Sequence, residues 1–166
     1  MNRVLVLFFL LLTNLLAAGH IEKISKAQPF HGTALSEEDL EGKVILVEFW
    51  GTQCPPCVAS LPKLQALHEK YKGTGKFQMI GSHVQSKSGK TDELISKNAL
   101  TFPIFQQLRL DGLSFTGIPY LALINHKGEI VEKGRFSFDL IEKYVEAAPS
   151  GMLMGIDVEH HAKTVK

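Results

Sequence analysis

The sequence predicts a three-layer α/β/α domain built around a central mixed sheet. The segment Val44–Trp50 is apolar at all positions but one, as in a parallel strand that is buried on both faces. Helical spacing follows from Pro55 to Lys72, and strand-like and helical segments then alternate along the chain. A hairpin pattern and a last helical pattern over Phe138–Ala148 complete the sheet and one of its covering layers.

The 166 residues are 45% hydrophobic, which is enough for one domain with a substantial core. We expect a lead-in over residues 19–29, the main domain over 30–148, and a C-terminal extension over 149–166 that has no assigned role. Outside residues 1–18, whose only charged residue is Arg3, positive and negative side chains are equal in number, at 17 each. This balance and the lack of a basic stripe indicate neither nucleic acid nor an anionic membrane surface as a partner.

Residues 1–18 have the architecture of a signal peptide. Arg3 precedes an apolar run without charges over residues 4–12, and the small residues Ala17 and Ala18 suit a signal peptidase. We expect cleavage near Ala18, which would release a soluble domain, and an uncleaved membrane anchor is the alternative. Both interpretations place the domain outside the cytoplasm, in the periplasm.

The first half of the domain contains two strands and a helix. Ser36, followed by Asp39, resembles a capping box and predicts a short helical turn in the irregular lead-in to the first strand. The helix that starts at Pro55 contains Pro62, which should kink it. After a glycine-rich break, the segment Phe77–Val84 alternates loosely and predicts the second strand.

The second half is expected to contain an inserted helix and strand, a hairpin and a final helix. Thr91 or Asp92 can cap the inserted helix, which should run to about Ala99, and Thr101–Phe105 resumes an extended character. The expected hairpin strands, Tyr120–Ile124 and Glu129–Lys133, flank a turn whose last residue is a glycine suited to the left-handed conformation. The apolar stripe of the last helix should cover the sheet.

The chain has only two cysteines, Cys54 and Cys57, at the junction between the first predicted strand and its helix. Thiol-disulfide exchange needs an attacking thiolate and a second thiol close by, and this spacing supplies both. A zinc site would need two further ligands at suitable spacing, and a structural disulfide would close too small a loop to stabilise the fold well. The pair therefore predicts a redox centre, with no metal and no cofactor besides its own disulfide.

The two cysteines are expected to have different roles. Cys54, at the positive end of the helix dipole, should have a lowered thiol pKa and attack the substrate disulfide. Cys57, one turn further in, should be more buried and resolve the mixed disulfide. Pro55 and Pro56 have no backbone N–H with which to stabilise a Cys54 thiolate, and this favours a reductant over an oxidant.

With these motifs in place, the sequence resembles the thioredoxin superfamily, and its extracytoplasmic TlpA/ResA-type branch most closely. The resemblance spans Phe30 to Ala148 and is carried by Trp50, the Cys54–Cys57 segment and Ile118-Pro119, together with the inserted helix and strand. It implies a thioredoxin-like fold and a thiol-disulfide oxidoreductase that acts on protein thiols or disulfides. Recharging by a membrane thiol electron donor, and a role in cytochrome c maturation, are further implications of this resemblance.

The resemblance also assigns roles to single residues. Glu48 matches the buried acid of thioredoxins that relays a proton from the resolving thiol, at a position where TlpA/ResA-type members often have asparagine. Burial should raise the pKa of Glu48, and an inert, hydrogen-bonded carboxylate is the alternative. Pro119 matches a cis-proline that leaves the Ile118 backbone free to pair with substrate. TlpA/ResA-type relatives often carry glutamate at the position of Ser60, and an aromatic residue commonly stands at that of Gln53, so this chain departs from the pattern at these positions as well.

The candidate residues are Cys54, Cys57 and Glu48 for catalysis and Trp50, Pro55, Pro56, Ile118 and Pro119 for contact with substrate or support of the active-site loop. A disulfide-forming oxidase remains an alternative with the same chemistry in the opposite direction. A redox-inactive binding module with this fold is the alternative of another class.

Overall fold

The computed structural model describes residues 19–149, so the predicted signal peptide and all but the first residue of the predicted C-terminal extension lie outside the described part. Six strands form one sheet in the order β1-β4-β3-β2-β5-β6. The strands are β1 (Pro29–His31), β2 (Val44–Trp50), β3 (Phe77–His83), β4 (Ile104–Gln106), β5 (Tyr120–Ile124) and β6 (Ile130–Gly134). The helices are α2 (Pro55–Tyr71), α3 (Gly89–Lys97) and α4 (Phe138–Ala147), and residues 19–25 are also helical.

The sheet is mixed, as the sequence predicts. β2 pairs in parallel with β3, and β3 with β4, because α2 and α3 carry the chain back between these strands. β5 runs antiparallel to β2 and to β6, and β1 runs antiparallel to β4. The closing hairpin therefore extends the sheet on one side of β2, and the inserted strand extends it on the other.

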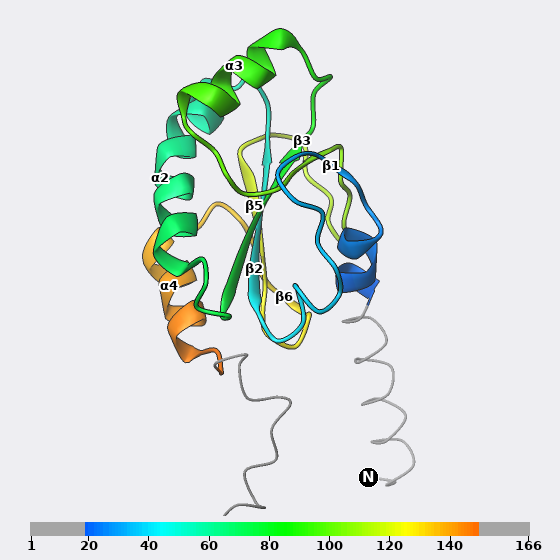
Figure 1. Ribbon diagram of the computed structural model, residues 1–166, viewed down its shortest axis with the longest axis vertical. Coiled ribbons are helices and arrows are strands. Elements are labelled where there is room, and N and C mark those ends of the chain that lie inside the picture. Colours follow the sequence, from blue (N-terminus) through cyan, green and yellow to red (C-terminus); the bar gives the residue numbers. More distant parts are fainter. Residues whose placement is uncertain (1–18, 150–166) are drawn as a thin grey trace, which may run out of the picture.

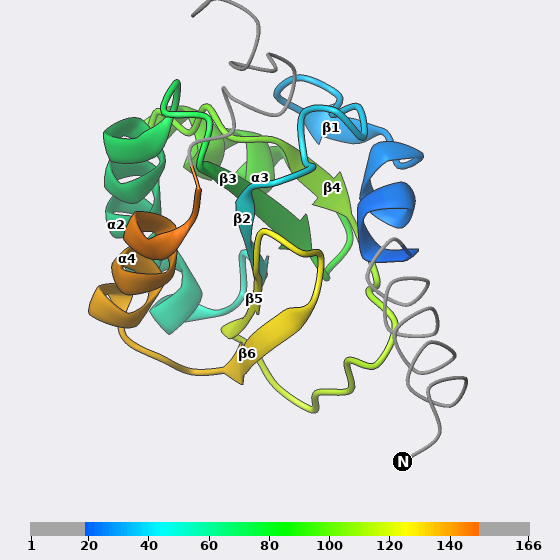
Figure 2. The ribbon, with the colours of Figure 1, turned by 90° about the horizontal axis from the view of Figure 1, so that it is seen from below.

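Helices and loops cover both faces of the sheet. Figures 1 and 2 show α2 and α4 side by side on one face, with the helical segment of residues 19–25 on the other. Side chains of β2 alternate between two cores: Leu46 and Trp50 pack toward α2, and Val47 and Phe49 pack toward the opposite side. Every residue of β2 is buried, which explains the nearly continuous apolar run in its sequence.

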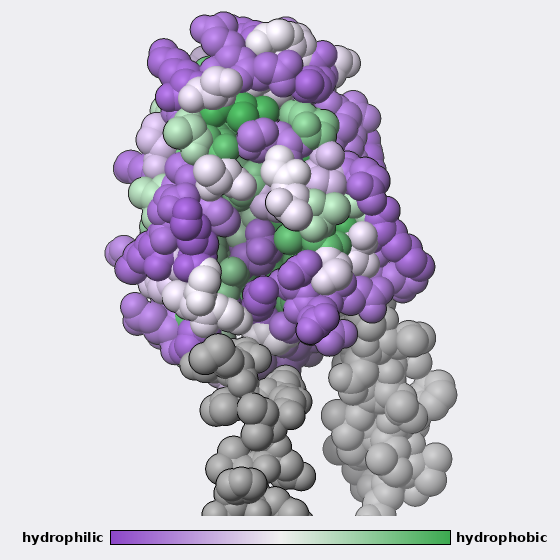
Figure 3. Space-filling view, viewed as in Figure 1, coloured by the Kyte–Doolittle hydropathy of each residue, from purple (hydrophilic) through white to green (hydrophobic). Residues whose placement is uncertain are grey.

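The surface seen in Figure 3 is mainly hydrophilic, with a few separate apolar patches. Within residues 19–149, no helix is both long enough and apolar enough to cross a membrane.

The lead-in differs from the expected irregular segment. Residues 19–25 are helical, and Ile24 has no exposed surface because it packs into the core on the face opposite α2. The folded unit therefore begins before residue 30. The capping box at Ser36 is present as expected, since its hydroxyl accepts the N–H of Asp39 at 3.1 Å and its own N–H donates to the Asp39 carboxylate at 2.8 Å.

Two other boundaries differ from the expected ones. α3 begins at Gly89 with Ser88 as its N-cap, and the Thr91 hydroxyl accepts the Ser88 N–H at 3.1 Å from inside the first turn. Neither Thr91 nor Asp92 is therefore the cap. In the hairpin, Gly128 has the expected positive φ of 82°, but β6 starts after Glu129, whose backbone closes the turn onto Asn125.

The burial of β2 gives a direct test of the fold. We expect Leu46→Ala to lower the free energy of unfolding by about 2–5 kcal/mol, because a fully buried leucine leaves a cavity between the sheet and α2. Urea unfolding of the oxidised protein measures this loss. The exposed Glu38→Ala is the matched control and should change the free energy by less than about 0.5 kcal/mol; an equal effect of both variants would contradict the packing.

Candidate active site

Cys54 and Cys57 form a disulfide at the junction between the end of β2 and the start of α2, with their Cα atoms 5.2 Å apart. Cys54 is the N-cap of α2, and its Sγ accepts the Cys57 N–H at 3.3 Å. Cys54 keeps 7% of its surface exposed and Cys57 none. The outer sulfur therefore belongs to Cys54 and the inner one to Cys57, which is the arrangement that their predicted roles require.

Two prolines occupy the first positions of α2. Pro55 and Pro56 are exposed and offer no N–H groups, so the Cys57 N–H is the backbone donor to Cys54 Sγ in the described structure. The helix dipole still acts on Cys54, but the first turn contributes fewer amide donors than a turn without prolines. α2 continues as one helix through Pro62.

Gln85 fixes the loop that precedes Cys54. Its side-chain carbonyl accepts the Gln53 N–H at 2.9 Å and the Thr52 hydroxyl at 3.3 Å. Gly51 passes so close that an added Cβ would lie 2.5 Å from the Gln85 side chain. The sequence analysis missed Gln85, because a contact across 32 residues leaves no local pattern.

Trp50 forms the floor of this loop. Trp50 has no exposed surface. The centroids of its ring and of the His83 ring on β3 are 4.9 Å apart, and the two ring planes are inclined at 74°. The expectation that Trp50 packs beneath the loop agrees with this position, but its inclusion among residues that touch substrate does not. His83 has no exposed surface, and burial lowers the pKa of its imidazole ring.

The peptide bond between Ile118 and Pro119 is cis, as expected from the resemblance. Both residues are half-buried and precede β5, and Ile118 packs against the core that contains the two cysteines. Pro119 also lines a small cavity with Glu48 and Ser60. The cis-proline segment and the buried acid thus lie on the same side of the sheet as the cysteine pair.

Glu48 projects from β2 toward α2 and is 1% exposed. Burial raises the pKa of its carboxyl group to about 8, although a hydrogen bond from Ser60 opposes the rise. The Ser60 hydroxyl lies 2.8 Å from Glu48 Oε1 and 2.7 Å from the Cys57 carbonyl oxygen, whereas Glu48 Oε2 has no partner within the described residues. At neutral pH the acid is therefore held largely in its neutral form.

The cavity at Glu48 has a volume of about 170 Å³ and mainly apolar walls. Leu64 of α2 and Phe136 and Phe138 near the start of α4 contribute to these walls, and the exposed Arg135 stands among the lining residues. Apolar walls give an ionised carboxylate little solvation, which explains the direction of the Glu48 pKa shift.

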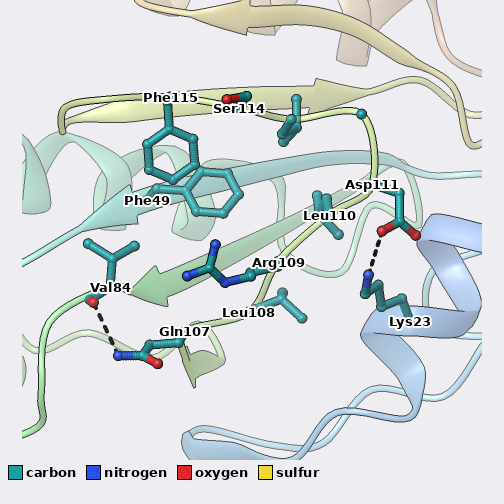
Figure 4. Close-up of a pocket in the computed structure, with 12 residues that line it drawn as sticks. Lys23, Phe49, Val84, Gln107, Leu108, Arg109, Leu110, Asp111, Ser114 and Phe115 are labelled. Atoms are coloured by element: carbon teal, nitrogen blue, oxygen red, sulfur yellow. Dashed lines mark hydrogen bonds and ion pairs between the residues drawn. The ribbon is translucent and has the colours of Figure 1, made fainter.

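A larger pocket of about 490 Å³ lies on the opposite face of the sheet (Figure 4). Phe49 and Phe115 meet there with their ring centroids 4.8 Å apart, and Lys23 pairs with Asp111 at 2.7 Å. Phe49 is the neighbour of Glu48 on β2 and faces the other way. This pocket is lined by neither cysteine and is separated from Glu48 by the sheet.

Among residues 19–149, no group of three or more histidine, cysteine, aspartate or glutamate side chains is arranged to hold a metal ion.

Comparisons with known proteins agree with this site. The chain matches the Redoxin family over residues 23–145. The thiol-disulfide oxidoreductase ResA of Halalkalibacterium halodurans is 30% identical over 124 residues, which cover 72% of this chain and 70% of that protein. ResA of Oceanobacillus iheyensis is 29% identical over 152 residues, which cover 82% of this chain and 79% of that protein.

Solved structures share the fold. A thiol-disulfide isomerase from Corynebacterium glutamicum superposes with a TM-score of 0.59 at 25% identity, covering 73% of this chain and 90% of its own. A putative thioredoxin from Neisseria meningitidis gives a TM-score of 0.60 at 24% identity, covering 81% of this chain and 92% of its own. The protein is a thiol-disulfide oxidoreductase with a thioredoxin-like fold. It belongs to the Redoxin family and is of the ResA/TlpA type within the thioredoxin superfamily.

The raised pKa of Glu48 predicts an unusual dependence of stability on pH. An unfolded glutamate titrates near 4.5 and the folded Glu48 near 8, so the free energy of unfolding should fall as pH rises through this window. The loss approaches about 5 kcal/mol above pH 8. Glu48→Gln should be as stable as the wild type near pH 4.5 and more stable than it at pH 9.

Urea unfolding of the oxidised protein at several pH values measures this difference. The exposed Glu38→Gln is the control and should follow the wild-type curve. Parallel curves for the wild type and Glu48→Gln would show that Glu48 is ionised in the native state at neutral pH, contrary to the prediction.

Proposed function

We propose that the protein reduces disulfide bonds of partner proteins outside the cytoplasm. The observation that carries the proposal is the placement of Cys54 as the N-cap of α2, followed by Pro55 and Pro56. A dithiol becomes a strong oxidant when its reduced form is strongly stabilised. With two amide donors missing from the first turn, the Cys54 thiolate receives less stabilisation, which favours reduction of the substrate.

The reaction starts from the reduced protein. The Cys54 thiolate attacks one sulfur of the substrate disulfide, a bond forms between Cys54 and that sulfur, and the other substrate sulfur leaves as a thiolate that takes up a proton. Cys57 then attacks Cys54, the mixed disulfide breaks, and the second substrate sulfur leaves as a thiolate that is also protonated. The substrate gains two electrons and the protein ends with its Cys54–Cys57 disulfide.

The second attack requires Cys57 to lose its proton in a buried place. Cys57 has no exposed surface, and Glu48 is the acid buried on the same side of the sheet. A carboxylate with a raised pKa is a suitable base for a thiol because the two affinities for the proton are close. We propose that Glu48 takes the Cys57 proton in its ionised form, which is the minority form below pH 8, and later returns the proton during recharging.

Ile118 provides the proposed docking backbone for the substrate. It precedes β5 and is only half-buried, so its peptide groups lie beside the site without belonging to a strand of the described sheet. An extended substrate segment could pair with them as an added strand, with its disulfide held over Cys54. Pro55 and Pro56 would form the exposed rim on the other side.

Turnover requires an external source of electrons, because each cycle leaves the pair oxidised. We propose a membrane thiol protein as this donor, with cytochrome c maturation as the pathway that supplies the substrates. The resemblance to TlpA/ResA-type proteins and the signal-peptide pattern of residues 1–18 support both the donor and the extracytoplasmic location.

The reduction potential of the Cys54/Cys57 couple tests the direction of the reaction. We expect a value near or below that of thioredoxin, roughly −270 mV, from equilibration in defined thiol buffers. A value near −120 mV is that of a strong oxidant and would overturn the proposal in favour of disulfide formation. Pro55→Gly with Pro56→Gly, which restores two N–H donors, should raise the potential.

A trapping experiment tests the roles of the two cysteines. We expect Cys57→Ser to accumulate mixed disulfides with partner proteins through Cys54, because the resolving thiol is absent. Non-reducing electrophoresis followed by mass spectrometry identifies the trapped cysteines. Cys54→Ser is the matched control and should trap at most a trace; full biological function of this variant would instead support a redox-inactive binding module.

A further inference from the structure

We propose that Ser60 is a positioning residue for the proton transfer between Cys57 and Glu48, and that its hydroxyl couples the charge of Glu48 to the turn of α2 that carries Cys57. The inference rests on the proposed function for the reaction that it serves. It concerns the position where TlpA/ResA-type relatives often carry a glutamate and where this chain has a hydroxyl instead.

The geometry places one hydroxyl between two acceptors. Ser60 Oγ lies 2.8 Å from Glu48 Oε1 and 2.7 Å from the carbonyl oxygen of Cys57. A serine hydroxyl has a single hydrogen, so it can make a full two-centre hydrogen bond to only one of the two oxygens at a time. Both contacts are full hydrogen bonds at the same time when the Glu48 carboxyl group donates to Ser60 while Ser60 donates to Cys57.

Loss of the Glu48 proton changes this chain of hydrogen bonds. An ionised carboxylate only accepts, so the Ser60 hydroxyl must turn toward Glu48 Oε1 to stabilise its charge. The Cys57 carbonyl oxygen then loses the hydrogen bond from Ser60. Protonation of Glu48 reverses the change, so the two states of the acid correspond to two hydrogen-bond arrangements at the Cys57 turn.

The same contact leaves one carboxylate oxygen available for the reaction. Ser60 holds Oε1, and Glu48 Oε2 is buried without a partner among the described residues. In the resolving step, the ionised Glu48 carboxylate takes the proton of the Cys57 thiol, and the Cys57 thiolate attacks Cys54 Sγ, which breaks the mixed disulfide and releases the substrate thiolate. Ser60 contacts neither sulfur in this scheme; it orients the acceptor and stabilises its charged form before the transfer.

Ser60→Ala and Ser60→Thr together test the inference. The alanine variant removes the hydroxyl, and the threonine variant keeps it on nearly the same atoms. We expect Ser60→Ala to raise the pKa of Glu48 by about one unit, because the ionised form loses its hydrogen bond, and Ser60→Thr to restore the wild-type value. Carboxyl ¹³C NMR titration of the oxidised protein measures this pKa without any turnover, with Glu48→Gln identifying the signal.

The second readout is the rate of the resolving step as a function of pH. Stopped-flow measurements that start from a mixed disulfide preformed on Cys54 give this rate. We expect the Ser60→Ala profile to move to higher pH, with a roughly tenfold slower step on its acidic limb. An unchanged Glu48 titration in Ser60→Ala overturns the inference. A uniform loss of rate without a shift of the profile, or no rescue by threonine, also overturns it because a merely structural role gives that result.

The two proposals fail in different ways. A shifted Glu48 titration in a protein whose reduction potential is that of an oxidant would leave the Ser60 inference standing and remove the reductase. A reduction potential typical of a reductase, together with an unshifted Glu48 titration in Ser60→Ala, would leave the proposed function standing and remove the Ser60 inference.

Discussion

The burial of β2 on both faces is the constraint on which the rest of the structure depends. Neighbouring strands bind its edges, α2 and α4 cover one face, and residues 19–25 help to cover the other. Because the strand is fixed on every side, its end sets the position of Cys54 and the start of α2. The same burial takes Glu48 out of water, so one constraint places the disulfide and raises the pKa of the nearby acid.

The parts of the fold that could be predicted from the sequence have local causes. An apolar run bounded by a cysteine pair marks β2, helical spacing marks α2 and α4, and a glycine with positive φ closes the hairpin. The cis bond before Pro119 was predictable only through the resemblance to a known family. The boundaries of α3 and β6 shifted because side chains of Thr91 and Asn125 bind the backbone in the turns, which a periodic pattern does not reveal.

The parts that could not be predicted depend on contacts between distant segments. Gln85 holds the active-site loop from another strand end, and Ile24 enters the core from a segment that reads as polar and irregular. Ser60 was visible only as a departure from relatives, since its bridge to Glu48 requires β2 and α2 to be packed together first. Trp50 fits the family motif, yet its complete burial makes it a support of the loop rather than a contact for substrate.

Two titratable groups are buried in the core near the active-site segment, where Glu48 is hydrogen-bonded to Ser60 and His83 packs on Trp50. Burial shifts the pKa values of these two groups in opposite directions. It raises the pKa of Glu48 to about 8 and lowers that of His83 below 6.5, so each is held in its neutral form. Ionisation of Glu48 weakens the fold as pH rises, and protonation of His83 weakens it as pH falls below 6.5. Between these limits neither Glu48 nor His83 is predominantly charged. Transfer of the Cys57 proton therefore needs the ionised form of Glu48, which is the minority form below pH 8. In that step a single negative charge moves from the carboxylate to the sulfur, and the low polarity of the surroundings penalises any arrangement that adds a second charge.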